Sequence, residues 1–195
     1  YYIAITNFIF ASIDILSLGF FSVNSDVGVF SIILRIVLPF SVMLIVINNL
    51  FSRDFSVWYE AGELDKCIQL YTKLVKGSLV VGSMYLVIII VFSHDILYFF
   101  GGDFVKGRDA LIITSIGYFV LFVSGPSAVM LMMTGYEKDY RNILIYTSIL
   151  NLALSVVFVS FFGLLGAAIS TSVSLIVKNI ASLRLAKIKF GVWSF

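Results

Sequence analysis

The chain contains the apolar run Leu86-Val87-Ile88-Ile89-Ile90-Val91-Phe92, which lies in an uncharged stretch from residue 77 to residue 92. No polar residue alternates with these apolar ones, whereas a strand of a membrane barrel needs about 10 residues of alternating polarity. Backbone groups without hydrogen bonds are very costly in lipid, so a run of this kind crosses a membrane as a helix. The stretch therefore predicts an α-helical membrane span.

The composition of the whole chain agrees with this prediction. Of its 195 residues, 61% are apolar and 12% are charged, and the mean hydropathy is +1.08. Soluble domains carry about 45–50% apolar and about 25% charged residues. The net charge of +2 is too small to indicate a nucleic-acid partner. With one cysteine, Cys67, and one histidine, His94, neither an intrachain disulfide nor a cysteine–histidine metal cluster is expected, and we expect no cofactor.

Six apolar windows are candidates for helices that cross the membrane, which takes about 20 residues. They cover residues 2–21, 27–51, 77–92, 110–134, 142–162 and 164–183. The predicted fold is all-α, with residues 1–195 forming a single transmembrane unit of six helices. Because the chain begins with Tyr1 inside an apolar run, we expect it to be a fragment whose upstream part is missing.

The basic residues predict the orientation of these spans. Lysine and arginine are retained on the cytoplasmic side of short loops. Ten of the 13 lie on one side of the predicted membrane: Arg53, Lys66, Lys73, Lys76, Lys138, Arg141, Lys178, Arg184, Lys187 and Lys189. The other side holds only Lys106 and Arg108. Both ends of the segment are therefore expected in the cytoplasm.

Two of the segments that connect predicted spans have an apolar pattern that predicts local structure. Residues 64–75 place apolar side chains at helical spacing, which predicts an amphipathic helix along the inner interface or a plain connecting helix. Residues 96–102 are apolar but too short to span, and they predict an interfacial segment with a glycine turn on the outer side.

Two strong charges lie inside predicted spans, Asp14 in the first and Arg35 in the second. Each is about 10–12 Å from the outer end of its span, where an ionisable group costs about 2.5–3.5 kcal/mol or more and faces a partner or a cavity. In one interpretation Arg35 faces a cavity and attracts an anionic group such as phosphate, while Asp14 holds it or takes a coupling cation. In a second interpretation Asp14 and Arg35 form a structural ion pair. In a third interpretation the predicted boundary of one of the two spans is misplaced.

Other polar and helix-bending residues give weaker signals. Lys178 is near the inner end of the sixth span, where its stem can extend to the headgroups or its ammonium can reach a cavity. Asn48 and Asn49 are candidates for capping, for a cavity or for a gate. Pro39 and Pro126 predict kinks in the second and fourth spans. The small residues 166–172 predict close packing of the sixth span against another helix.

Several segments in order resemble the C-terminal half of the multidrug/oligosaccharidyl-lipid/polysaccharide exporter superfamily, in particular the flippases for O-antigen and capsule repeat units. The segments that carry the resemblance are residues 14–21, 27–30, 33–36, 58–62, 100–104, 125–126, 134–138 and 162–169. They include Trp58-Tyr59-Glu60-Ala61-Gly62 and Phe100-Gly101-Gly102-Asp103-Phe104. Together they cover nearly the whole chain.

The resemblance implies one lobe of a two-lobed transporter, with the other six-helix lobe upstream. Such carriers work by alternating access and move an undecaprenyl-pyrophosphate-linked oligosaccharide from the inner to the outer leaflet of the cell membrane. Arg35 matches the intramembrane arginine of the family and would contact phosphate or an acidic sugar. The lipid-linked oligosaccharide and membrane lipid are the implied partners, together with the polymerase and glycosyltransferases of lipopolysaccharide or capsule biosynthesis.

Two other functions remain open at this stage. A cation-coupled multidrug antiporter of the same superfamily would use a membrane carboxylate such as Asp14. A subunit of a membrane polysaccharide polymerase would need several catalytic polar groups and a sizeable loop. The longest connection here has about 25 residues and the chain has one histidine, so we expect no enzyme.

Overall fold

The computed structural model describes residues 13–20 and 24–191, and every regular element in these ranges is a helix. Residues 13–20 form one helical segment. The elements that follow are α2 (Asn24–Glu60), α3 (Leu64–Val91), α4 (Ser93–Phe100), η1 (Gly102–Gly107), α5 (Arg108–Ser124), α6 (Pro126–Met133) and α7 (Glu137–Phe190). The predicted all-α class is confirmed.

Four helices of the described ranges are long and apolar enough to cross a membrane: Asp26–Glu60, Leu64–Val91, Gly102–Ser124 and Glu137–Phe190. Their outer faces suit lipid, since α3 exposes Val80, Met84, Val87 and Val91 along one stripe. A membrane-embedded helical protein is therefore the fold class. The first predicted span falls mostly outside the described residues, so a total of six crossings stays a prediction.

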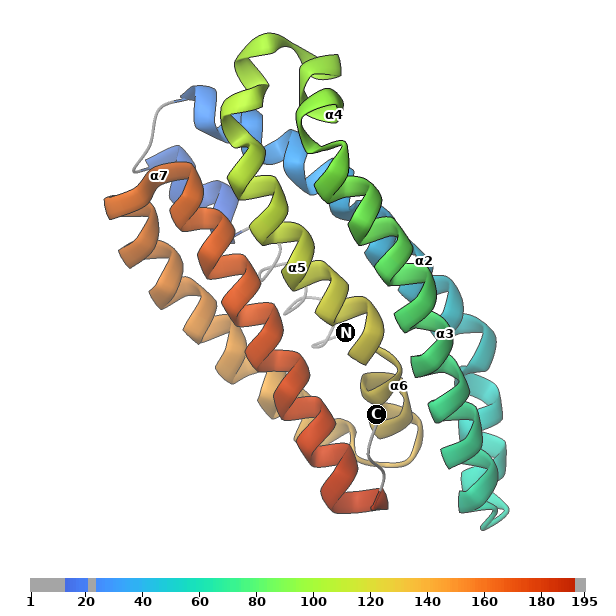
Figure 1. Cartoon of the computed structure of the whole chain (residues 1–195). Coiled ribbons are helices and arrows are strands. Elements are labelled where there is room, and N and C mark those ends of the chain that lie inside the picture. The colour runs from blue at the N-terminus through green and yellow to red at the C-terminus, as the bar shows by residue number, and fades with distance from the viewer. Residues whose placement is uncertain (1–12, 21–23, 192–195) are drawn as a thin grey trace.

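The helix α7 combines the fifth and sixth predicted spans. With 54 residues it would extend about 80 Å as a straight rod, far beyond the ~30 Å of a hydrocarbon core. Gly163 has non-helical angles of φ 52 and ψ −122, and the chain folds back there. Figure 1 shows the two arms of α7 side by side, in orange and red. The reversal lies at the predicted boundary between residues 162 and 164.

The helix α3 corrects the prediction for residues 64–75. These residues do not lie along the interface as a separate amphipathic helix, because Leu64–Val91 is one continuous helix. The buried side chains Cys67, Tyr71 and Val75 pack in one cluster with Phe55 of α2 and Met130 of α6. Burial against neighbouring helices thus accounts for the apolar stripe that suggested an interfacial helix.

The two prolines have different effects on their helices. α2 runs through Pro39 as a single helix of 37 residues. The predicted fourth span is instead divided at Gly125, where α5 ends and α6 begins with Pro126. Proline cannot donate the hydrogen bond that would continue α5 but fits the first turn of α6.

The helix α5 lies at the centre of the bundle and packs against α2, α3 and α7 (Figure 1). Its approach to α7 is close, because a Cβ atom on Gly117 would lie 2.7 Å from the Cα atom of Ser172. The Ser172 hydroxyl also donates a 2.8 Å hydrogen bond to the Ile113 carbonyl. Ser172, at the end of the small-residue run 166–172, therefore packs against α5.

Candidate functional site

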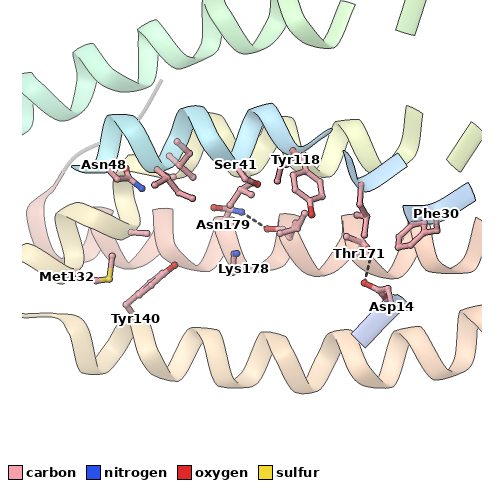
Figure 2. A pocket seen from close by; sticks show the side chains of 18 residues that line it. Asp14, Phe30, Ser41, Asn48, Tyr118, Met132, Tyr140, Thr171, Lys178 and Asn179 are labelled. Carbon is pink, nitrogen blue, oxygen red and sulfur yellow. Dashed lines mark hydrogen bonds between the residues drawn. The ribbon is translucent and has the colours of Figure 1, made fainter. Parts of the chain in front are cut away.

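A cavity of about 480 Å³ lies among the segment 13–20, α2, α5, α6 and α7. Its apolar wall includes Phe30, Leu34 and Leu44. Its polar lining consists of Asp14, Ser41, Asn48, Tyr118, Tyr140, Thr171, Lys178 and Asn179. Figure 2 shows Asp14 and Thr171 at one end, Asn48 and Met132 at the other, and Lys178 between them. A polar cavity inside an otherwise apolar bundle is the candidate site.

Asp14 is 3% exposed and accepts hydrogen bonds from both arms of α7. Asn151 of the first arm donates to Oδ2 at 3.3 Å. On the second arm, the Thr171 hydroxyl donates to Oδ2 at 2.6 Å and the Ser170 hydroxyl donates to Oδ1 at 2.8 Å. Ser155 of the first arm is buried beside the same carboxylate. The polar groups around Asp14 thus come from both arms of α7.

All three hydrogen-bond donors to Asp14 are neutral. No ion pair among the described residues includes Asp14, and residues 1–12, 21–23 and 192–195 contain no lysine, arginine or histidine. A buried carboxylate without a cation is costly, so the group is suited to take up a proton or a metal cation. Carboxylate and hydroxyl oxygens are the ligands that hard cations prefer. The role of Asp14 as the group that takes a coupling cation stays a prediction.

The predicted ion pair between Asp14 and Arg35 is not formed. Arg35 is exposed on α2 and is absent from the cavity lining. The adjacent Leu34 does line the cavity, together with Leu38, Ser41, Ile45 and Asn48 along one face of α2. The prediction rested on depth in the membrane, and depth does not determine the face of a helix, because successive side chains are rotated by about 100°.

Lys178 replaces Arg35 as the cation of this cavity. It is 7% exposed and lines the cavity, so the interpretation in which its stem extends to the headgroups is wrong. Thr171, which contacts Asp14, and Lys178 are seven residues apart on α7, so their positions along the helix are separated by about 10 Å. The cavity therefore presents a carboxylate at one end and an ammonium group two helical turns away.

The two asparagines of α2 have different surroundings. Asn48 lines the cavity, whereas Asn49 is exposed and does not. The site residues that sequence reasoning missed are Tyr118, Tyr140, Asn151, Ser155, Ser170, Thr171 and Asn179. A signal for some of them was present, since the polar residues Asn151 and Ser155 are one turn apart in an apolar arm, and Thr171 and Asn179 are about two turns apart in the other.

Cys67 is buried against the Phe55 carbonyl, and His94 lies on α4 beside Asp95, both away from the cavity. Within residues 13–20 and 24–191 no cluster of three or more histidine, cysteine, aspartate or glutamate residues forms a transition-metal site. Comparison of the chain with protein-family models, curated proteins and solved structures finds no match. The functional argument therefore rests on the cavity itself.

Proposed function

We propose that the chain is one six-helix lobe of a two-lobed membrane carrier that flips an undecaprenyl-pyrophosphate-linked oligosaccharide between leaflets by alternating access. The observation that carries this proposal is the cavity that buries Asp14 and Lys178 inside an apolar helical bundle. Ionisable groups in membrane helices are costly and mark substrate or ion pathways. The resemblance of the ordered sequence segments to the flippases supplies the substrate class.

Lys178 and Arg35 have separate roles in this proposal. Lys178 lies inside the lobe and attracts the pyrophosphate or an acidic sugar, because an ammonium group binds phosphate as a point charge. Arg35 lies on the exposed face of α2, within an apolar stretch. A charge there would face hydrocarbon unless a second lobe or a water-filled cavity covers it. The exposure of Arg35 thus supports a missing partner lobe that shares the substrate path.

Asp14 supplies the coupling in this scheme. A proton or a sodium ion that binds its carboxylate removes the cost of a buried, uncompensated charge. The ion also changes the contacts of Asp14 with the two arms of α7, which the hydrogen bonds of Asn151, Ser170 and Thr171 now fix. Binding at this point is therefore able to favour one arrangement of the lobe over another.

The test is complementation of surface polysaccharide in cells that lack the full-length protein. Lys178→Gln and Arg35→Gln should each abolish surface polysaccharide and leave the lipid-linked repeat unit on the cytoplasmic leaflet, with normal protein levels. Lys138→Gln, at an exposed position outside the cavity, is the matched control and should complement fully. Normal polysaccharide with Lys178→Gln would contradict a substrate role for the cavity.

The oxygen cluster around Asp14 also favours a second candidate, the cation-coupled multidrug antiporter. Such a carrier would use the carboxylate, but the cell would not need it to make surface polysaccharide. Cells that lack the protein would then keep their polysaccharide and become more sensitive to cationic drugs. Asp14→Asn should fail to restore drug resistance in that case.

A further inference from the structure

A second cavity, separate from the candidate site, lies on the outside of the bundle between α2 and α3. It encloses about 610 Å³. The side chains that line it are Val42, Met43, Val46, Ile47 and Phe51 of α2, Leu70, Lys73, Leu74, Gly77, Ser78 and Val81 of α3, and Phe122 of α5. We call it the α2–α3 groove. In a membrane, a groove on the outer face of two spanning helices is open to lipid.

The groove carries a charge near one end. Phe122 of α5 also lines it, and α5 packs tightly on α3 there, because a Cβ atom on Gly82 would lie 2.9 Å from the Phe122 ring. Lys73 lines the groove about one turn from Leu70, the end of its lining on α3. Along α3 the distance from Leu70 to Val81 is about 16 Å, a length that suits a stretch of acyl chain.

The charged end adjoins a hollow on the surface of α3. Lys73 also lines this hollow, together with Ile68, Gln69, Thr72 and Lys76. Lys73 and Lys76 are exposed and take part in no ion pair within the described ranges. An apolar groove with one ammonium group near its end, and a second on the adjoining hollow, is complementary to an anionic amphiphile.

One polar side chain inside the groove lacks a partner. Ser78 is 2% exposed, and its hydroxyl oxygen forms no hydrogen bond. A buried hydroxyl without a partner is costly, and such groups normally find an acceptor. Ser78 is five residues from Lys73, about 7 Å deeper along α3. The ester carbonyls of a phospholipid lie below its phosphate in this way, whereas a polyprenyl chain has no acceptor at that depth.

We propose that the α2–α3 groove binds one acyl chain of an anionic phospholipid, with the phosphate at Lys73 and an ester oxygen at Ser78. The site is distinct from the substrate cavity, since no residue lines both. The inference requires only that these helices span a membrane, and it holds for any transported substrate. If the proposed topology is correct, the lipid belongs to the cytoplasmic leaflet.

The test uses tryptophan quenching by lipids that carry bromine on their acyl chains. Val46→Trp places a reporter in the groove, in a full-length protein whose other tryptophans are phenylalanine, reconstituted in phosphatidylcholine vesicles. Brominated phosphatidylglycerol should quench it with about fivefold higher apparent affinity than brominated phosphatidylcholine. Lys73→Gln should remove this preference, and Gly77→Phe, which has space for a side chain, should reduce quenching by both lipids.

The matched control is Val80→Trp, which lies exposed on α3 outside the groove lining and should be quenched equally by both lipids. Equal quenching of Val46→Trp by the two lipids would overturn the proposal, and so would a preference that survives Lys73→Gln. Displacement of the brominated lipid by undecaprenyl phosphate at lower concentrations than unlabelled phosphatidylglycerol would also overturn it, because the groove would then hold the tail of the carried lipid.

Discussion

The carboxylate of Asp14 is the residue on which the proposed chemistry depends most. Its type and approximate depth were predictable from the sequence, because an aspartate in an apolar span is rare and stands out. Its partners were not predictable, since Ser170 and Thr171 are 156 and 157 residues away along the chain. Serine and threonine are also common in membrane helices as packing residues. Only the fold shows that these hydroxyls converge on Asp14.

The hydroxyl of Thr171 should contribute more to stability than an ordinary threonine hydroxyl in the same helix. Thr171→Val removes a 2.6 Å hydrogen bond to Asp14 and should lower the free energy of unfolding by about 2 kcal/mol. Thr147→Val is the matched control, because the Thr147 hydroxyl bonds only carbonyls of its own helix. Thermal unfolding in detergent gives both values. Equal losses would mean that the contact with Asp14 adds nothing.

The carboxylate should also make stability depend on a cation. If the cluster binds sodium, replacing choline chloride by sodium chloride at ten times the dissociation constant should stabilise the protein by about 1.4 kcal/mol. Asp14→Asn should remove this increment, since the neutral amide no longer attracts the ion. The measurement is the unfolding midpoint in the two salts. If proton uptake provides the coupling, both salts should give the same midpoint, and the sodium version of the proposal would be wrong.

At the scale of the element, hydropathy located the helices and the reversal at Gly163, but not the other boundaries between helices. The apolar windows matched parts of α2, α3, α5, α6 and α7, because transfer to lipid depends mainly on composition. Whether two windows join, or one divides, depends on single residues. Gly125-Pro126 divides the fourth span, whereas the connecting residues 64–75 continue directly into the third.

Gly163 is the residue that the reversal of α7 requires. Its φ of 52° is a conformation that residues with a side chain rarely adopt. Gly163→Ala should therefore destabilise the protein by about 1–3 kcal/mol. Gly77→Ala, in a helix with open space around it, should leave stability unchanged or raise it by up to about 1 kcal/mol. Denaturant unfolding of the two variants compares them directly, and a tolerated alanine at 163 would contradict the strained reversal.

At the scale of the whole molecule, sequence reasoning gave the class of protein and a topology. The class follows from bulk composition, which needs no knowledge of contacts. The cavity did not follow, because its lining comes from five segments whose rotation about their axes the sequence does not determine. For this reason Leu34 faces the cavity where one interpretation placed Arg35, and Lys178 lines the cavity, one of its two predicted positions.

The topology predicts opposite sides of the membrane for the two ends of α3. Cys67 is buried and is a poor reporter, so new cysteines are needed in a Cys67→Ser background. Gly102→Cys, at an exposed position of η1, should react with an impermeant maleimide in intact cells. Ala61→Cys, in the exposed turn before α3, should react only after the cells are made permeable. Reaction of both cysteines in intact cells would refute the predicted topology.

The hydrogen bonds of Asp14 have one more consequence, which concerns cohesion. The segment 13–20 contacts both arms of the α7 hairpin through the side chain of Asp14, and the two arms are continuous in sequence at Gly163. The carboxylate therefore links three helical segments of the bundle. An ion that displaces one of these hydroxyls would weaken the attachment of both arms to the segment 13–20 at the same point.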